Sequence, residues 1–202
     1  GEWESVKPAD PRLCSSEFHI VATAQQSLEA AAGIATANGV TPWIVSDRLE
    51  GEARLVARDM AGLVTDVTRE GQPLWPPCLL LSGGETTVTV RGHGQGGRNA
   101  EFLLALGIEL GVRQGVFALA CDTGGIDGTE ATAGAVWRPD TLVRAAALGL
   151  DPGRFLKDND AHRFFRSLGD SVVTGPTRTN VNDFRAVLVL PLAELDRAND
   201  AA

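Results

Sequence analysis

The sequence is poor in the residues that build zinc sites and disulfide frameworks. Its three cysteines and three histidines stand far apart in the 202-residue chain: Cys14, Cys78, Cys121, His19, His93 and His162. Structural zinc sites need cysteines or histidines paired at short spacing, so this pattern does not predict one. Cys78 and Cys121 lie in apolar runs, which predicts buried thiols in a reducing cytosol rather than disulfides.

Basic residues and long apolar runs are also scarce. Lysine and arginine total 18 against 26 acidic residues, which gives a formal net charge of −8. Non-specific nucleic-acid binding needs a basic face, so the charge argues against it. No apolar run approaches the roughly 20 residues that span a bilayer, and the start lacks the pattern of a signal peptide. We therefore expect a cytoplasmic protein that binds neither nucleic acid nor membrane.

The hydrophobic pattern predicts alternating strands and helices. The expected strands are 18–23, 42–45, 78–81, 116–121, 172–174 and 184–190, and the expected helices are 25–37, 49–67, 98–110, 141–148 and 161–168. A β-α-β-α order at the start indicates parallel strands joined by right-handed crossovers. The predicted fold class is therefore α/β, with a mixed, largely parallel sheet flanked by helices.

The chain divides into four predicted segments. Residues 1–17 read as a linker, and residues 18–77 as a β-α-β-α segment that completes an upstream domain or packs on the next one. Residues 78–192 form the predicted C-terminal α/β domain, and residues 193–202 a tail. Because the chain starts at Gly1 without methionine, we expect a fragment or a processed portion of a longer protein.

Two glycine clusters flank the β-branched segment 86–91. The first is Ser82-Gly83-Gly84-Glu85; the second, Gly92 to Gly97, leads into Arg98 at the start of a predicted helix. Such loops can present bare amides and charges to an anionic ligand. An arginine at that position can clamp a carboxylate or phosphate with two hydrogen bonds. The alternatives are that the glycines only make tight turns and that the arginine is an exposed helix residue.

Three polar loops follow apolar runs, at 82–85, 122–130 and 175–183. In open α/β sheets ligands collect beyond the carboxyl ends of strands, so these loops are predicted to meet along one edge. The carboxylates of Asp122, Asp127 and Glu130 suit Mg²⁺. The alternative is a turn at Asp127-Gly128 with Glu130 starting a helix. The Asn and Asp residues of 179–183 can likewise serve only to close turns.

Three long motifs carry a family resemblance. The stretches SGGETTVTVRGHGQGGRNAEF, DTGGIDGTEATAGA and NDAHRFFRSLGDSVVTGPTRTNVND, in this order, resemble the C-terminal half of the type 2 D-glycerate kinases. That family contains a MOFRL domain, and its members are often labelled hydroxypyruvate reductase. The resemblance extends over nearly the whole chain and makes 78–192 a MOFRL-like domain.

The resemblance implies a reaction and a set of site residues. The reaction is phosphoryl transfer from ATP to the 2-hydroxyl of D-glycerate, or of a related hydroxy acid, with Mg²⁺. Arg98, in the GGRN motif, corresponds to the family's catalytic arginine. The implied substrate-binding residues are Ser82, Gly83, Gly84, Glu85, Thr86, Asn99, Thr179, Asn180 and Asn182. The implied metal ligands are Asp122, Asp127, Glu130 and Asp183.

The chain departs from the family in length and at two motif positions. Family members are roughly twice as long, with an N-terminal domain that supplies a catalytic lysine, whereas Lys7 and Lys157 are the only lysines here. We therefore expect this chain to be inactive without an N-terminal domain or partner chain, and a homodimer remains open. Arg178 stands where glycine is usual in GPTGTN, and Ala100 where glutamine is common. Arg178 adds bulk and charge near the predicted site, which predicts altered specificity.

Two other functions stay open at this point. An NAD(P)H-dependent hydroxypyruvate reductase would need GxGxxG between a strand and a helix, followed by an acidic residue for the ribose. Gly92, Gly94 and Gly97 give that spacing, but a hairpin-like segment precedes them and no ribose acid is evident. A non-catalytic module that binds a small ligand is the third reading.

Overall fold

The computed structural model describes residues 10–11, 17, 19–128 and 131–192, and most of the predicted linker and all of the tail lie outside these residues. The elements are α1 (Ala24–Ala37), β1 (Thr41–Glu52), α2 (Ala53–Glu70), β2 (Cys78–Thr87), α3 (Arg98–Leu110), β3 (Val116–Asp122), β4 (Gly134–Trp137), α4 (Thr141–Ala147), α5 (Pro152–Lys157), α6 (Ala161–Leu168), β5 (Ser171–Val172) and β6 (Asp183–Val189). Six strands form one sheet in the order β1-β2-β6-β3-β4-β5. The predicted mixed α/β fold is confirmed.

The prediction that the sheet is largely parallel is wrong. Only β1 and β2 pair in parallel, across the α2 crossover, and the other pairs in the described sheet are antiparallel. The difference arises because β6 returns from the end of the chain and inserts between β2 and β3, antiparallel to both. As a result β1, β2 and β3 still point the same way. Their carboxyl ends share one edge of the sheet, and β6 begins at that edge.

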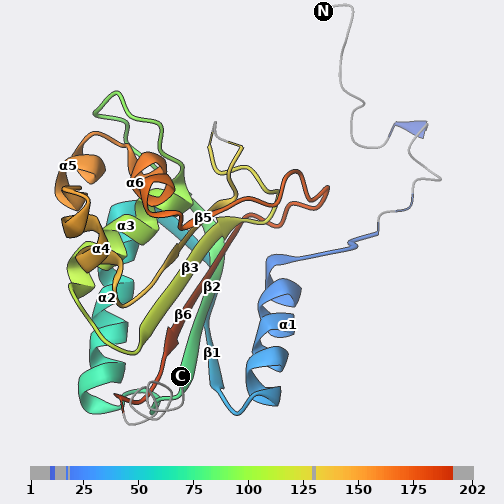
Figure 1. Cartoon of the computed structure of the whole chain (residues 1–202). Coiled ribbons are helices and arrows are strands. Elements are labelled where there is room, and N and C mark those ends of the chain that lie inside the picture. Colours follow the sequence, from blue (N-terminus) through green and yellow to red (C-terminus); the bar gives the residue numbers. More distant parts are fainter. Residues whose placement is uncertain (1–9, 12–16, 18, 129–130, 193–202) are drawn as a thin grey trace, which may run out of the picture.

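Helices cover the two faces of the sheet unequally. Figure 1 shows α2, α3 and the short helices α4 to α6 on one face, with α1 as the only described helix on the other. α3 is apolar on nearly all sides, with Phe102, Leu103 and Leu104 fully buried, as expected for a helix enclosed by its neighbours. None of the described helices is long and apolar enough to cross a membrane.

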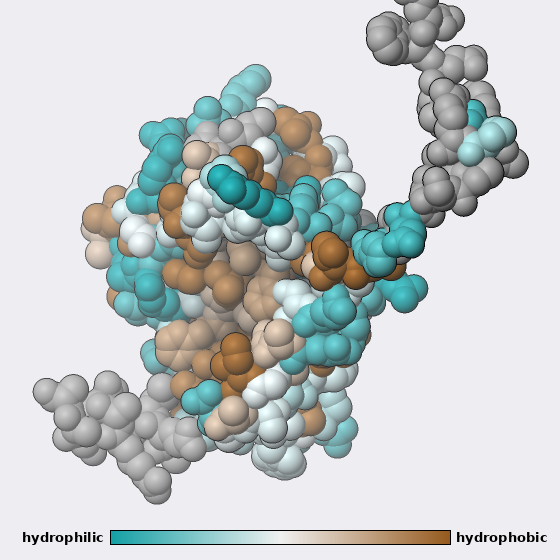
Figure 2. Space-filling model, turned by 90° about the vertical axis from the view of Figure 1, so that its right-hand side faces the viewer, coloured by the Kyte–Doolittle hydropathy of each residue, from teal (hydrophilic) through white to brown (hydrophobic). Residues whose placement is uncertain are grey.

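The face that carries α1 is left partly open. Figure 2 shows a hollow with apolar side chains on that side of the molecule. A cavity of about 270 Å³ is lined there by residues from β2, β3, β4 and β6, namely Leu79, Phe117, Ala118, Leu119, Val136, Trp137, Arg138, Ala186 and Leu188. An antiparallel sheet facing water normally alternates polar residues outward, so this face has the composition of a packed surface instead.

Several element boundaries differ from the sequence prediction. Residues 19–23 form no strand, because the chain there pairs with no other described strand and leads directly into the N-cap of α1 at Thr23. β1 continues through Ser46 and Asp47 by means of register shifts against β2. Residues 82–85, predicted as a loop, lie within β2. The short elements β4 and α5 were not predicted, since neither is long enough to show a hydrophobic period.

Gly84 shows why glycine occupies the interior of β2. Its φ is 118°, and a Cβ there would lie 2.2 Å from the carbonyl oxygen of Leu49 on β1. We expect Gly84→Ala to lower the free energy of unfolding by about 2–3 kcal/mol, because the two strands cannot separate without losing their pairing. Gly33→Ala in α1 is the matched control, since nothing lies within 4 Å of its added methyl group.

Urea denaturation of both variants measures this difference. The control should be neutral or up to about 1 kcal/mol more stable than the parent, because alanine is the better helix former. Equal stabilities of the two variants would show that the backbone of β1 does not restrict position 84.

Candidate active site

Arg98 lies at the sheet edge where β2 and β3 end and β6 begins. It is the first residue of α3, and its side chain is 23% exposed. Its Nε donates to Asp183 Oδ1 at 2.6 Å and its Nη2 to Asp122 Oδ2 at 2.7 Å. Its Nη1 lies 3.7 Å from Glu85 Oε1. The guanidinium is therefore fixed in orientation, and Nη1 is its least committed nitrogen.

Several carboxylates surround Arg98 and shift the pKa values of the groups in the site. Burial by itself would lower the pKa of Arg98, but the hydrogen bond with Asp183 and the charges of Asp183, Asp122 and Glu85 outweigh it and raise the pKa. The pKa of Asp122 is also raised, chiefly by burial, although the Gly124 N–H and Arg98 act to lower it. The charges of Asp183 and Asp127 add to that rise. The site thus holds excess negative charge around a guanidinium that stays protonated.

Asp183 connects Arg98 to a second, buried guanidinium. Its Oδ1 also accepts from Asn99 Nδ2 at 2.7 Å, and its Oδ2 accepts from Thr86 N at 3.1 Å and pairs with Arg185 Nη2. Arg185 is 1% exposed and lies over the ring of Phe102, 4.8 Å from its centroid. Burial lowers the pKa of Arg185, and Asp183 opposes that effect. Asp183 is therefore the central anion of the cluster.

Asp127 caps the helix that positions Arg98. Its carboxylate accepts from Asn99 N at 3.1 Å and from Ala100 N at 2.9 Å, and it lies 3.3 Å from His162 Nε2. Asp127 is 1% exposed. The N-terminus of α3, which favours anions, is thus already occupied by a carboxylate of this chain. Gly97 permits this contact, since a Cβ there would lie 2.2 Å from Asp127 Cγ.

The second glycine cluster packs against the connection between α5 and α6. The backbone N–H groups of Arg91, Gly92, His93 and Gln95 donate to side chains of residues 158–160, and that of Gly94 donates to the Asp158 carbonyl. A Cβ at Gly92, Gly94 or Gly96 would lie within 2.6 Å of that segment. These amides are therefore engaged, which corrects the expectation that the loop offers them to an anionic ligand.

A buried polar cluster holds the same loop from beneath. Glu101 is fully buried and accepts from Arg54 Nε at 2.7 Å and from Asn159 Nδ2 at 3.0 and 3.1 Å. Asn159 Oδ1 in turn accepts from Arg91 N at 2.7 Å. The cluster joins α2, α3 and the α5–α6 connection, and its role is to fix the loop that precedes Arg98.

Two cavities adjoin at Arg98, and Glu85, Arg98 and Gly128 line both. The larger cavity, about 670 Å³, is lined by Glu50, Gly51, Glu85, Thr86, Thr87, Val88, Val90, Gly96, Gly97, Arg98 and Gly128. The smaller, about 520 Å³, is lined by Glu85, Arg98, Asp122, Gly124, Ile126, Gly128, Pro176, Arg178, Thr179 and Asn180. Both volumes are within the range of small-molecule sites.

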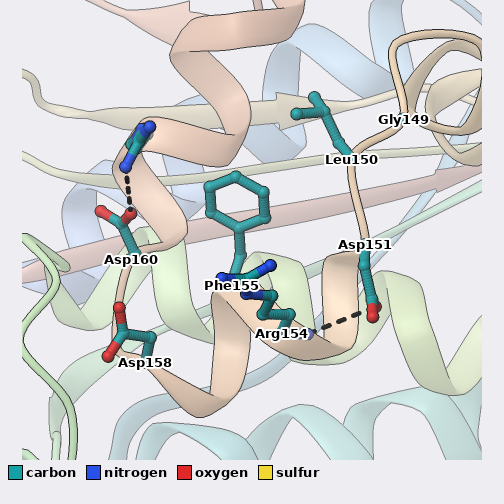
Figure 3. Close-up of a pocket in the computed structure, with 8 residues that line it drawn as sticks. Gly149, Leu150, Asp151, Arg154, Phe155, Asp158 and Asp160 are labelled. Atoms are coloured by element: carbon teal, nitrogen blue, oxygen red, sulfur yellow. Dashed lines mark hydrogen bonds and ion pairs between the residues drawn. The ribbon is translucent and has the colours of Figure 1, made fainter.

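A further cavity of about 290 Å³ lies between α4, α5 and α6 and shares no lining residue with the two cavities at Arg98. Figure 3 shows Phe155 projecting between the segment with Gly149 and Asp151 and the segment with Asp158 and Asp160. Its aspartates accept from backbone N–H groups, as Asp151 does from Arg154 N, and Arg163 pairs with Asp160. We assign no ligand to it.

The predicted substrate-binding residues separate into two groups. Glu85, Thr86, Thr179 and Asn180 line the cavities at Arg98. The others do not, for local reasons. The neighbouring strands cover Ser82, Gly83 and Gly84, and Asn99 is fully buried. The backbone carbonyl of Asn182 accepts hydrogen bonds from Thr123 N and Oγ1. We leave this second group out of the proposed site.

The predicted metal ligands do not fit a magnesium ion held by protein carboxylates. Among the described residues, no group of three His, Cys, Asp or Glu side chains has an arrangement that could hold a metal. Asp122 and Asp183 bind guanidinium groups, and Asp127 caps α3. Glu130 lies outside the described residues. We derive no step through a metal ion.

The sequence reasoning missed Arg185 and the His162 contact. The signal for Arg185 is the alternation of β6, where Asp183, Arg185, Val187 and Val189 share the face toward α3. Two opposite charges two residues apart on an apolar face indicate a buried pair. His162 carries no such signal, since its approach to Asp127 joins α6 to a loop 35 residues away.

Two of the cysteines are free thiols in the described part of the chain. Cys78 is buried, as predicted, and Cys121 is half-buried. Burial first, and then the charge of Asp122, raise the pKa of Cys121 from 9.0 to about 11. That shift reduces the thiolate fraction about 100-fold, and the thiolate is the reactive form.

We therefore expect iodoacetamide to alkylate Cys121 about 100-fold more slowly at pH 8 in the folded protein than in urea. Mass spectrometry of the peptide that contains Cys121 gives the rate separately from the other cysteines. Equal rates in the folded and unfolded protein would contradict the environment described for this thiol.

Comparison with known proteins places this geometry in a family. Residues 78–183 match the model of the MOFRL family. A protein named "Putative hydroxypyruvate reductase" from Agrobacterium vitis is 47% identical over 177 residues, which cover 87% of this chain and 46% of that protein. A D-glycerate 2-kinase from Thermotoga maritima is 35% identical over 192 residues, which cover 93% of this chain and 46% of that protein.

A solved structure shows the same similarity. The crystal structure of a glycerate kinase from Thermotoga maritima superimposes with a TM-score of 0.83 at 36% identity, over 86% of this chain and 42% of that one. This chain thus spans less than half the length of these relatives. Because the family model matches more than half of the chain, the chain belongs to the MOFRL family, whose relatives here include glycerate 2-kinases.

Proposed function

We propose that this chain forms the acceptor-binding part of a glycerate 2-kinase, which transfers the γ-phosphoryl group of ATP to the 2-hydroxyl of D-glycerate or a related hydroxy acid. One observation carries the proposal. The guanidinium of Arg98 is fixed by Asp122 and Asp183 in the wall shared by two cavities. In the reaction the bond from the γ-phosphorus to its bridging oxygen breaks as the hydroxyl oxygen bonds to that phosphorus.

Arg98 is suited to the charge that this reaction moves. Phosphoryl transfer is catalysed mainly by positioning the reactants and by stabilising charge on the transferred group. With Nε and Nη2 bound to carboxylates, Nη1 is the nitrogen able to donate to a phosphoryl or carboxylate oxygen. Glu85, whose side chain is 56% exposed, lies beside Nη1 and can move into solvent when an anion binds.

The rest of the reaction needs groups that the described residues do not supply. The family resemblance locates a catalytic lysine and much of the nucleotide site in an N-terminal domain, and Mg²⁺ would bind chiefly through the phosphates of ATP. We therefore propose that this chain alone has no kinase activity. The free thiols Cys78 and Cys121 support a reducing cytoplasmic location.

A hydroxypyruvate reductase is the second candidate, favoured by the name of the Agrobacterium vitis relative. The structure gives it less support. Of the glycines that match the dinucleotide motif, Gly92 and Gly94 pack against residues 158–160 and Gly97 packs against Asp127. The N–H groups of residues 91–95 are bonded to residues 158–160. A pyrophosphate would need those glycines and amides to be open.

One pair of assays tests the proposal on the full-length gene product that carries this chain. With ATP, Mg²⁺ and D-glycerate, we expect formation of 2-phosphoglycerate, detected by ³¹P NMR. With NADH and hydroxypyruvate, we expect no oxidation of NADH above background. NADH oxidation without phosphoryl transfer would replace the kinase by the reductase, and ligand binding with neither reaction would leave a binding module.

A further inference from the structure

The loop that borders the smaller cavity contains a strained arginine. Among the described residues other than glycine, positive φ angles occur at Asn159, Arg178 and Asn182. Asparagine tolerates this region, but for arginine, whose φ is 64° here, it is unusual. Strain of this kind concentrates at sites where a side chain must be held in a particular place. The placement of the Arg178 side chain therefore needs an explanation.

The guanidinium of Arg178 is uncommitted. Arg178 is exposed and lines the 520 Å³ cavity together with Arg98. No described residue forms an ion pair or a side-chain hydrogen bond with it, whereas the carboxylates of this cavity, Asp122 and Glu85, both face Arg98. Its five N–H donors are thus available to a ligand.

The two guanidinium groups on this cavity differ in the donors they have left. Nη1 of Arg98 can donate to one oxygen of a first carboxylate, whereas the planar fork of Arg178 can bind a second carboxylate through two parallel hydrogen bonds. The cavity also offers the polar side chains of Thr179 and Asn180, and its volume is well above that of glycerate. Of the two cavities at Arg98, the larger contains Val88 and Val90 but not Arg178.

We propose that Arg178 binds a second anionic group on the acceptor. The preferred substrate is then a 2-hydroxy acid that carries another carboxylate at its far end, rather than glycerate itself. This inference rests on the proposed function and specifies the substrate class of the same site.

The test compares D-glycerate with D-malate, which has the same configuration at C2 and a terminal carboxylate. In the full-length gene product at saturating ATP, we expect kcat/KM to be at least about tenfold higher for D-malate. Arg178→Gly should lower kcat/KM for D-malate about tenfold and change that for D-glycerate less than about twofold. Arg178→Lys should retain part of the preference, because it keeps the charge but not the planar fork.

Glycine fits a φ of 64° without strain, so Arg178→Gly should keep its fold, which the unfolding midpoint in urea checks. Equal kcat/KM for D-malate in parent and variant would overturn the inference. A rise in the KM for ATP with both acceptors would also overturn it, since Arg178 would then serve the nucleotide phosphates.

Binding measurements distinguish a failure of this inference from a failure of the proposed function. If neither acid is phosphorylated, calorimetry of D-malate with the parent and with Arg178→Gly still decides. A tenfold weaker binding to the variant would support the role of Arg178 while the kinase proposal fails. Equal or undetectable binding to both proteins would refute the role of Arg178 as well.

Discussion

Arg98→Lys is expected to lower kcat/KM for the acceptor about 1000-fold in the full-length gene product, with the fold retained. Lysine keeps the positive charge but cannot bind Asp183 and Asp122 and still direct a further N–H at a ligand, as Nε, Nη2 and Nη1 of Arg98 do. Removing an arginine that stabilises a phosphoryl-transfer transition state typically costs 10³–10⁵ in rate. Steady-state assays of acceptor phosphorylation measure the loss.

The matched control is Arg58→Lys, the same exchange at an exposed position of α2. It should leave kcat/KM within about twofold of the parent, since exposed substitutions rarely affect a distant site. The unfolding midpoint of each variant shows whether a loss reflects chemistry or folding. Comparable losses in the two variants would contradict a specific role for Arg98.

Asp183→Asn is expected to lower the free energy of unfolding by about 3–5 kcal/mol. Asp183 is the only carboxylate in the described residues that pairs with Arg185, a guanidinium that is 1% exposed. Removing the charge of one partner leaves a buried cation without compensation, which is among the costlier changes in a protein core. Denaturation by urea measures the effect in this chain.

Asp140→Asn provides the control for this prediction. Asp140 pairs with Arg144 at 3.1 Å, but its side chain is 58% exposed. A surface pair of this kind contributes at most about 1 kcal/mol. A second variant that combines Asp183→Asn with Arg185→Met should recover part of the lost stability, because no buried charge remains. A loss below about 1 kcal/mol in Asp183→Asn would show that Arg185 does not depend on this carboxylate.

The sequence was sufficient where the signal is local. The boundaries of α3 and α6 were predicted correctly, because an apolar pattern of helical length is followed directly by Gly111 and Gly169. The path of β6 was not predictable in the same way. Its place between β2 and β3 depends on partners about 60 to 110 residues away in the chain, and its own pattern fits a parallel strand equally well.

The same division between local and long-range signals applies to the candidate site. The predicted topology indicated that loops after strands pointing the same way would meet at one edge of the sheet. The edge at Arg98 has this arrangement. Which groups remain available to a ligand could not be predicted. Asp127 was assigned to a metal because carboxylates suit Mg²⁺, yet only tertiary packing places it against the amides of Asn99 and Ala100. The metal and substrate-binding roles of these residues stay predictions.

The central claim is that Arg98 contacts the bound acceptor or the transferred phosphoryl group. A crystal structure of the full-length gene product with D-glycerate or D-malate and a non-hydrolysable ATP analogue tests it most directly. We predict that Arg98 keeps its bonds to Asp122 and Asp183 while Nη1 lies about 3 Å from an oxygen of the acceptor or of the γ-phosphate. An acceptor bound elsewhere, with Nη1 still facing Glu85, would contradict the account.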